Sequence, residues 1–202
     1  MSDQVGKWAP GLSYGPVLTQ TDLYLLDTPL QVNPVIAHNG DTKFHLVFNL
    51  ATGQTGGFNN EARDRDLPFT QKDEPATLPR VQELILITEL SPWCTIVKNE
   101  RGVTMSDVCT ALWKEYTENQ VTEAEFAALP PRLQEQVRRT AQNTAQTGWG
   151  GYYSPQQPIN RFRRIDWLRE KVYFDGLQKR DSYSVSRLGY KAPNVFIVQL
   201  LA

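Results

Sequence analysis

Strand-like patterns lie near both ends of the chain and helix-like patterns lie between them, and this order constrains the fold more than any other feature. Residues 44–50 ("FHLVFNL") place an apolar side chain at every second position, which is the period of a half-buried strand. Residues 84–87 are an unbroken apolar run, which favours a strand buried on both faces. Residues 94–99 ("CTIVKN") predict its partner strand, and residues 194–201 ("NVFIVQLL") predict a core strand.

Helices are predicted between these strands. Thr104 followed by Asp107, and Thr122 followed by Glu125, resemble capping boxes, in which two side chains satisfy free N–H groups at a helix start. A further helix is predicted over about 131–146, directly after two prolines. Helices grouped between strands favour an α+β fold. We expect an antiparallel sheet of about five strands packed against two or three helices.

The chain length suggests one α+β domain over residues 30–202, preceded by an extended N-terminal arm over residues 1–29. Pro and Gly are spread through the arm among aromatic residues, which discourages regular structure. A docked arm and a loose leader are both compatible with this pattern. Irregular insertions are predicted near 53–79, which is charged and contains prolines, and near 147–160, which is rich in Gly and Tyr.

The overall charge gives no reason to expect a charged partner. The 202 residues carry a net charge of −1, so only a local basic patch could attract nucleic acid or an acidic membrane. The N-terminus lacks the pattern of a signal peptide, and no apolar stretch approaches the ~20 residues that cross a bilayer. The two cysteines lie in apolar segments, which fits a reducing compartment. We expect a cytoplasmic or nuclear protein that does not associate with membranes.

Residues 98–113 ("KNERGVTMSDVCTALW") raise the question of a reactive centre, because Thr104, Ser106, Asp107 and Cys109 lie within six positions. A reactive thiol needs an activating base nearby, and nothing in the sequence indicates one. A helix start explains the same residues: Thr104 and Asp107 cap the helix, and Cys109 is a small buried hydrophobe. We therefore interpret this stretch as the passage from a strand to a helix.

No cofactor or metal is predicted. Cys94, Cys109, His38 and His45 lack the close paired spacing of zinc ligands. The glycines of "TGQTGG" (52–57) are not followed by the Lys-Ser/Thr pair or the helix of a phosphate-binding loop.

Acid–base chemistry has candidates but no selected pair. Asp107, Asp166 and Asp175 could each serve, yet their spacing singles out no two of them, and Asp166 has an ion-pair or capping role available beside its arginines. The chain contains neither a Gly-x-Ser-x-Gly elbow nor a His-Glu-x-x-His helix. The sequence therefore favours a protein without catalytic activity, and an enzyme with an unrecognised site is the alternative.

Residues 161–171 ("RFRRIDWLREK") hold five cations against two anions, interleaved with aromatic rings. Basic and aromatic residues together are typical of single-stranded nucleic-acid contacts. The same pattern also fits a helix whose apolar residues face the core while its arginines form a solvated face, and we favour this second interpretation. The candidate binding residues are Trp149, Tyr152, Tyr153, Arg161, Arg163 and Arg164.

Several segments occur together in an order that resembles a known family: "PLQVNPVIAHNGDTKFHLVFNL", "SPWCTIVKNERGVTMSDVCTALW", "VTEAEFAAL" and "RIDWLREKVYFDGL". They are similar to an uncharacterised domain-of-unknown-function family that is widespread in basidiomycete (mushroom-forming) fungi. The resemblance covers most of the chain from about residue 30. It implies a shared fold and a fungal source, and it implies no reaction.

The leading functional hypothesis is a non-enzymatic protein-interaction module. The catalytic motifs are missing, and residues 1–29 and 147–158 are irregular and rich in Tyr and Trp, which interfaces favour. A protein partner or self-association is expected. Nucleic-acid or phospholigand binding through residues 161–171 is the alternative.

Overall fold

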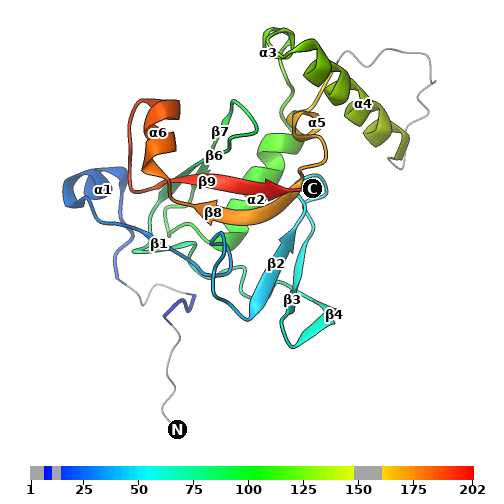
Figure 1. Cartoon of the computed structure of the whole chain (residues 1–202). Helices are drawn as coiled ribbons and strands as arrows, with labels where there is room; N and C mark the ends of the chain where they lie inside the picture. Colours follow the sequence, from blue (N-terminus) through cyan, green and yellow to red (C-terminus); the bar gives the residue numbers. More distant parts are fainter. Residues whose placement is uncertain (1–6, 11–14, 148–160) are drawn as a thin grey trace.

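The computed structural model describes residues 7–10, 15–147 and 161–202. Within these ranges the strands and helices follow one another in an order typical of an α+β protein (Figure 1). In chain order they are α1 (Gln20–Leu26), β1 (Gln31–Val32), β2 (Phe44–Phe48), β3 (Thr55–Asn59), β4 (Ala62–Leu67), β5 (Thr77–Leu78), β6 (Glu83–Ile87), β7 (Cys94–Lys98), α2 (Met105–Thr117), α3 (Glu123–Ala127), α4 (Pro131–Thr147), α5 (Arg164–Leu168), β8 (Tyr173–Gln178), α6 (Asp181–Leu188) and β9 (Val195–Leu201).

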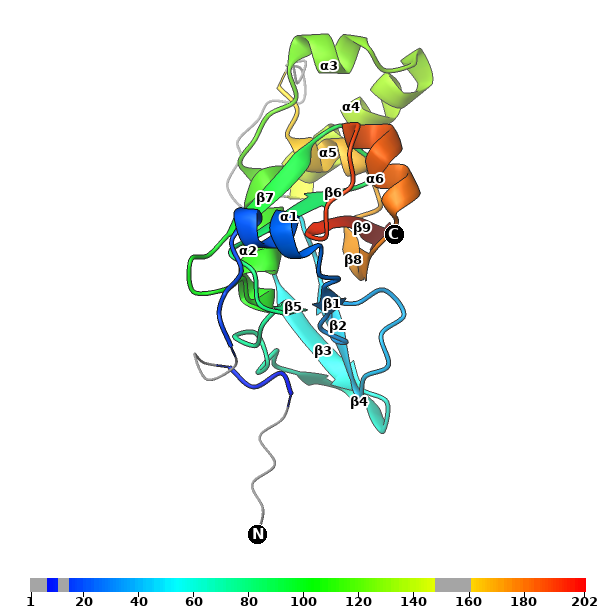
Figure 2. The same cartoon turned by 90° about the vertical axis from the view of Figure 1, so that its left-hand side faces the viewer.

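A four-stranded central sheet organises the molecule, with strand order β7-β6-β9-β8. Its β6–β7 and β8–β9 pairs are antiparallel, whereas β6 and β9 run parallel. A second sheet, β2-β3-β4, extends away from the central one, and β1 pairs with β5 (Figures 1 and 2).

The α+β fold class is confirmed, and the strands predicted at residues 44–50, 84–87, 94–99 and 194–201 all form. The arrangement differs from the expected one because the strands are divided among three sheets and one pairing is parallel. The parallel pair has a physical basis. An apolar run buried on both faces suits the interior of a sheet, and β6 has β7 on one side and β9 on the other.

Both faces of the central sheet are covered over the inner strands β6 and β9. On one face Leu84, Leu86 and Val97 join Val108 and Leu112 of α2 in the main hydrophobic core. On the other face Ile87, Val195 and Ile197 form a smaller cluster, against which Tyr183 and Leu188 from α6 pack. Alternate side chains of β6 and β9 therefore enter different cores, as the two-residue period requires, whereas on β7 only Thr95 and Val97 are buried.

Residues 1–29 are not an extended arm throughout, because residues 20–26 form α1. Thr19 and Asp22 build a capping box at the start of this helix. Leu18 and Leu23 are buried in the main core, and Leu18 also exchanges backbone hydrogen bonds with residues 80–82. Residues 18–26 are thus anchored on the domain through Leu18 and Leu23.

The irregular insertion predicted near 53–79 is wrong, because β3, β4 and β5 lie within it. The β2–β3 pairing depends on Gly57, where an added Cβ would lie 2.2 Å from the His45 carbonyl oxygen. Charged residues in β4 hid its strand character. Of the insertion predicted near 147–160, residue 147 ends α4 and residues 148–160 lie outside the described ranges.

Among the described residues, no helix has the length and the apolar character that crossing a membrane would require.

Candidate interaction surfaces

The predicted binding segment is only partly within the described ranges. Trp149, Tyr152 and Tyr153 lie outside them. Arg161 and Arg163 are exposed, so their side chains are available to a ligand. Arg164 is half-buried at the start of α5. The structure therefore separates the arginines into two exposed residues and one that faces the protein.

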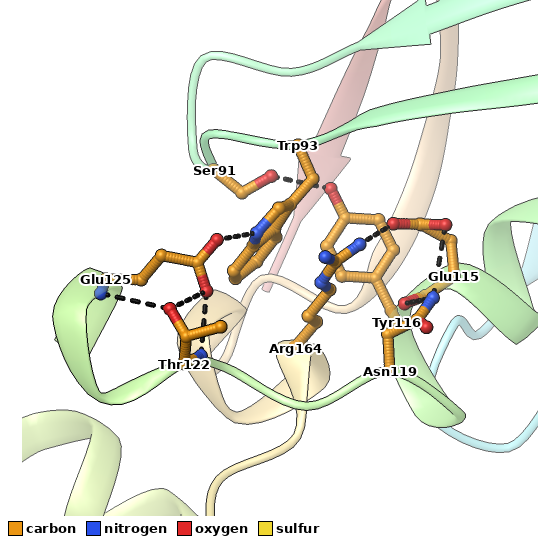
Figure 3. A network of polar contacts seen from close by, with 8 residues as sticks. All are labelled: Ser91, Trp93, Glu115, Tyr116, Asn119, Thr122, Glu125 and Arg164. Carbon is orange, nitrogen blue, oxygen red and sulfur yellow. Dashed lines mark hydrogen bonds and ion pairs between the residues drawn. The ribbon is translucent and has the colours of Figure 1, made fainter.

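Arg164 is engaged in contacts within the fold (Figure 3). Its guanidinium pairs with the Glu115 carboxylate of α2. The same group lies 4.6 Å from the centroid of the Trp93 ring, which is a cation–π distance. Burial lowers the pKa of Arg164. These contacts assign Arg164 a role in packing α5 against α2 and the β6–β7 turn.

Trp93 lies at the centre of this contact network, which we call the Trp93 cluster: Ser91, Trp93, Glu115, Tyr116, Glu125, Arg164 and Trp167. The Trp93 indole N–H donates to Glu125 Oε1 at 2.7 Å. Its ring meets those of Tyr116 and Trp167 edge-on, with centroids 6.2 and 5.1 Å away. The Trp167 indole N–H donates to the Leu90 carbonyl at 2.9 Å. Aromatic residues that could have stacked on bases are thus packed on one another.

The ionisable groups of the cluster have pKa values shifted by their surroundings. Burial raises the pKa of Tyr116 to about 12, against the opposing effect of a 2.7 Å hydrogen bond between its hydroxyl and that of Ser91. Burial would also raise the pKa of Glu125. Hydrogen bonds from Thr122 and Trp93 outweigh that effect, so this pKa is lowered. Apart from the buried Arg164 Nε, which lacks a hydrogen-bond partner among the described residues, the polar side chains of the cluster are bonded within the fold, which is typical of a network that specifies packing.

Asp166 is buried and caps α5, which confirms the capping role available to it. Its Oδ2 accepts the Arg163 backbone N–H at 2.8 Å. Burial raises the pKa of this carboxyl, although the hydrogen bond and charge of Arg163 act in the opposite direction.

The passage from β7 to α2 is a helix start, as predicted. The Asp107 backbone N–H donates to Thr104 Oγ1, and the Thr104 backbone N–H donates to Asp107 Oδ2. Cys109 is buried, and burial raises the pKa of its thiol to about 12. A thiol with that pKa is a poor nucleophile at neutral pH. Thr122 and Glu125 form the second predicted capping box.

The histidines and carboxylates form one pair that the sequence did not select. His38 Nδ1 lies 2.9 Å from Asp175 Oδ2, although the angles do not make a hydrogen bond. This approach requires Gly176, which has a φ of 126° and leaves no room for a Cβ beside the His38 backbone. His45 instead contacts Asn60 at 2.7 Å. In the described part of the chain, His, Cys, Asp and Glu do not gather in a group of three that could hold a metal ion.

Among the large apolar side chains of the described residues, the three with the highest exposed fractions are consecutive residues of α1. Tyr24, Leu25 and Leu26 are 84, 72 and 60% exposed, whereas Leu23 beside them is 1% exposed. The capping box and the buried Leu23 hold the helix in place. Three adjacent apolar side chains are therefore presented to solvent on an anchored element.

A pocket of about 520 Å³ opens beside these residues. Its lining is mostly apolar, and Leu26 belongs both to the pocket wall and to the exposed run. Lys7 and Gln31 add polar groups, and Lys7 Nζ donates to Gln31 Oε1 at 2.5 Å. The lining residues are Lys7, Gly15, Pro16, Leu18, Leu26, Thr28, Gln31, Leu78 and Pro79. We call Tyr24, Leu25, Leu26 and this pocket the α1 surface.

The model of a family described as "Family of unknown function (DUF6699)" matches residues 44–185. No curated protein and no solved structure matches. The matched range begins after α1 and ends within α6, before the central strand β9. The α1 surface therefore lies outside the matched range, apart from the pocket residues Leu78 and Pro79.

Proposed function

We propose that this chain, which belongs to the DUF6699 family of unknown function, is a non-enzymatic protein-interaction module that contacts its partner through the α1 surface. The observation that carries the proposal is the run Tyr24, Leu25 and Leu26, exposed beside an apolar pocket. Single exposed apolar residues are common, whereas contiguous ones next to a cavity mark interaction sites. Of the other large exposed apolar side chains of the described residues, Tyr173 and Leu201 lie opposite each other in the β8–β9 pair, and none of them lines this pocket.

The geometry suggests what the partner supplies. Tyr and Leu on α1 offer an apolar ridge, and the pocket of about 520 Å³ beside it has room for apolar side chains of a partner. Lys7 at the pocket favours an acidic group next to that side chain. The proposed partner is therefore a protein segment that carries a large apolar residue with a carboxylate close by. Because α1 precedes the matched range, this contact would belong to this chain rather than to the whole family.

A pair of matched double variants tests the proposal. Tyr24→Ser with Leu25→Ser removes the ridge, and Tyr190→Ser with Val185→Ser removes a tyrosine and an aliphatic residue of 48 and 46% exposure elsewhere. Both variants should keep the wild-type thermal stability, because exposed side chains contribute little to it. In quantitative affinity purification from the source organism, partners should be lost by the α1 variant and kept by the control. Equal recovery with both variants would overturn the proposal.

Nucleic-acid or phospholigand binding through residues 161–171 has weaker support. Arg161 and Arg163 are exposed, but Arg164 and Trp167 contact other parts of the protein. If this function exists, Arg161→Ala with Arg163→Ala should weaken salt-dependent retention on single-stranded RNA. Retention unchanged by the two substitutions would exclude these residues as the contact.

An enzyme would have to use a site that the sequence motifs do not reveal. His38 lies close to Asp175 but makes no hydrogen bond with it, and acyl transfer would also require a nucleophile beside the imidazole.

Two further expectations from the sequence stay predictions. One is the cytoplasmic or nuclear location, and the other is the fungal source that the family resemblance implies.

A further inference from the structure

The two outer strands of the central sheet differ in what pairs with them. Along β8, the Leu177 N–H donates to the Ile36 carbonyl, and the Leu177 carbonyl accepts the His38 N–H. Just before β8, the Val172 carbonyl accepts the Leu50 N–H. Residues 36–38 and 49–50 therefore cover that edge. Among the residues that the structure describes, no segment bonds to the outer side of β7.

The direction of the free backbone groups follows from the hydrogen bonds around β6. The Asn99 N–H donates to the Gln82 carbonyl at 2.9 Å, whereas the Gln82 N–H donates to the Leu18 carbonyl. Asn99 therefore points its N–H toward the β6 side, and because the direction alternates along a strand, Thr95 and Val97 of β7 also point their backbone groups toward β6. The Ile85 N–H donates to the Asn194 carbonyl just before β9, so Ile85 points its N–H toward β9 and away from β7. Its partner Ile96 on β7 therefore has no backbone bond to Ile85, which agrees with this alternation. The even-numbered residues of β7 therefore point their N–H and C=O groups away from the sheet.

These residues are Cys94, Ile96 and Lys98, and their side chains are exposed as well. Ile96 is 54% exposed and lies opposite the half-buried Ile85 of β6. Lys98 pairs with Glu83 at 3.0 Å, so its charge is balanced within the chain. The outer side of β7 thus combines free backbone donors and acceptors with a central apolar side chain.

We propose that β7 pairs antiparallel with β7 of a second copy of this chain, across a twofold axis that passes through Ile96. This is the register that pairs all three outward residues: Ile96 with Ile96, and Cys94 with Lys98 at both ends. Each of the three pairs exchanges two N–H···O=C bonds. The two central sheets would join into one continuous sheet.

The sequence of the edge favours a second copy over a foreign strand. A twofold axis at Ile96 sets two β-branched side chains against each other, a favourable cross-strand pair, and keeps the two Lys98 cations apart. An axis at Lys98 would set two cations opposite each other. An axis at Cys94 would leave Lys98 of each copy beyond the other's strand. Only the Ile96 register uses the full edge, and it does not involve the α1 surface.

Sedimentation velocity under reducing conditions tests the pairing. The wild-type chain of 23.0 kDa should form a species of twice that mass as its concentration rises. Ile96→Lys should weaken the dimer by about tenfold or more, because it sets two cations at the axis. Cys94→Glu should strengthen it by roughly threefold to tenfold, because each new carboxylate lies opposite Lys98 of the other copy. Val185→Lys, at a 46% exposed position on α6, should have no effect.

Three outcomes would overturn the proposal: a wild-type chain that stays monomeric at its highest soluble concentration, a dimer that Ile96→Lys leaves unchanged, and a dimer that Cys94→Glu weakens. Loss of a foreign partner on Ile96→Lys without any wild-type dimer would show that another protein's strand occupies the edge. A dimer lost only in the Tyr24→Ser, Leu25→Ser variant would move the interface to α1.

A cross-link checks the register independently of the dissociation constant. Opposite Cα atoms in a hydrogen-bonded antiparallel pair are about 5.5 Å apart, which a disulfide can bridge. Ile96→Cys in a Cys94→Ser background should therefore form a disulfide-linked dimer on mild oxidation. Val185→Cys in the same background should stay largely monomeric. Equal cross-linking of the two variants would contradict the register.

Discussion

Residues 161–168 and helix α1 both carry aromatic and aliphatic side chains, but the fold packs those of the first segment against other elements and exposes most of those of the second. The first segment holds arginines and aromatics that look suited to a ligand, yet Arg164, Trp167 and the buried Phe162 contact other parts of the protein. The second was expected to be part of an irregular arm, yet it presents Tyr24, Leu25 and Leu26 on an anchored helix. The two regions lie at opposite ends of the central sheet (Figure 1).

The difference comes from what each region meets in the fold. Residues 161–168 meet α2, α3 and the β6–β7 turn, and these elements supply Glu115, Glu125 and Trp93 to the cluster. Helix α1 meets the core through Leu23 alone among its residues. Composition thus identified which side chains are capable of contact, and tertiary packing decided which of them are free to make one.

The largest effect is expected at Trp93. Trp93→Ala removes a buried aromatic side chain and leaves Glu125 and the Arg164 guanidinium without their aromatic partner. We expect the free energy of unfolding to fall by about 3–5 kcal/mol in urea titrations. Tyr190→Ala, at a 48% exposed tyrosine, should change it by less than about 0.5 kcal/mol. Similar losses in the two variants would show that the Trp93 cluster is not a packing centre.

The next effect separates the two sides of α1. Leu23→Ala should lower the free energy of unfolding by about 2–4 kcal/mol, because Leu23 is 1% exposed in the main core. Leu25→Ala on the same helix should change it by less than about 0.5 kcal/mol. Chemical denaturation of both variants measures the contrast. A large loss with Leu25→Ala would mean that this side chain contributes to the fold rather than to a contact surface.

A smaller effect distinguishes two neighbouring arginines. Arg164→Ala should lower the free energy of unfolding by about 1–2 kcal/mol, because it leaves the half-buried Glu115 carboxylate without its cation. Arg163→Ala keeps the backbone N–H that bonds to Asp166 and should cost less than about 0.5 kcal/mol. Thermal melting of the two variants in parallel checks the order. The reverse order would contradict the inward role of Arg164.

The smallest effect is a pH dependence at Asp166. Its pKa is raised in the folded state, so the folded chain holds that proton more tightly than the unfolded chain does. This group's contribution to stability is therefore largest at low pH and falls as pH rises from the unfolded value of 3.8 through the folded one. Asp166→Asn does not titrate, so its stability relative to the wild type should rise between pH 3 and pH 7. A constant or falling difference would contradict the raised pKa.

Much of the central sheet could be predicted from local patterns. Apolar patterns identified β6, β7 and β9 of the central sheet and β2 of the second sheet. The Thr104 and Thr122 capping boxes located the starts of α2 and α3. The capping box at Thr19 has the same chemistry. It was missed because prolines and glycines on both sides indicated an irregular arm.

What could not be predicted depends on contacts between distant residues. The β3–β4 hairpin contains glycines and charged residues, and the pairing of β3 with β2 depends on their close approach at Gly57. The Trp93 cluster joins residues more than 70 positions apart, so no spacing along the chain could reveal that Arg164 faces Trp93. The exposure of Tyr24, Leu25 and Leu26 could not be predicted for the same reason. The seven residues of α1 do not by themselves indicate which of their side chains will contact the core, and only Leu23 is buried.

The most direct test of the account is site-specific photo-cross-linking from α1 in an extract of the source organism. A photoreactive phenylalanine replaces Leu25 in one protein and Val185 in another, so that both probes start from exposed apolar positions. We expect a discrete covalent adduct from position 25 and none of the same mass from position 185. The same adduct from both positions, or none from position 25, would contradict the claim that α1 is the contact surface.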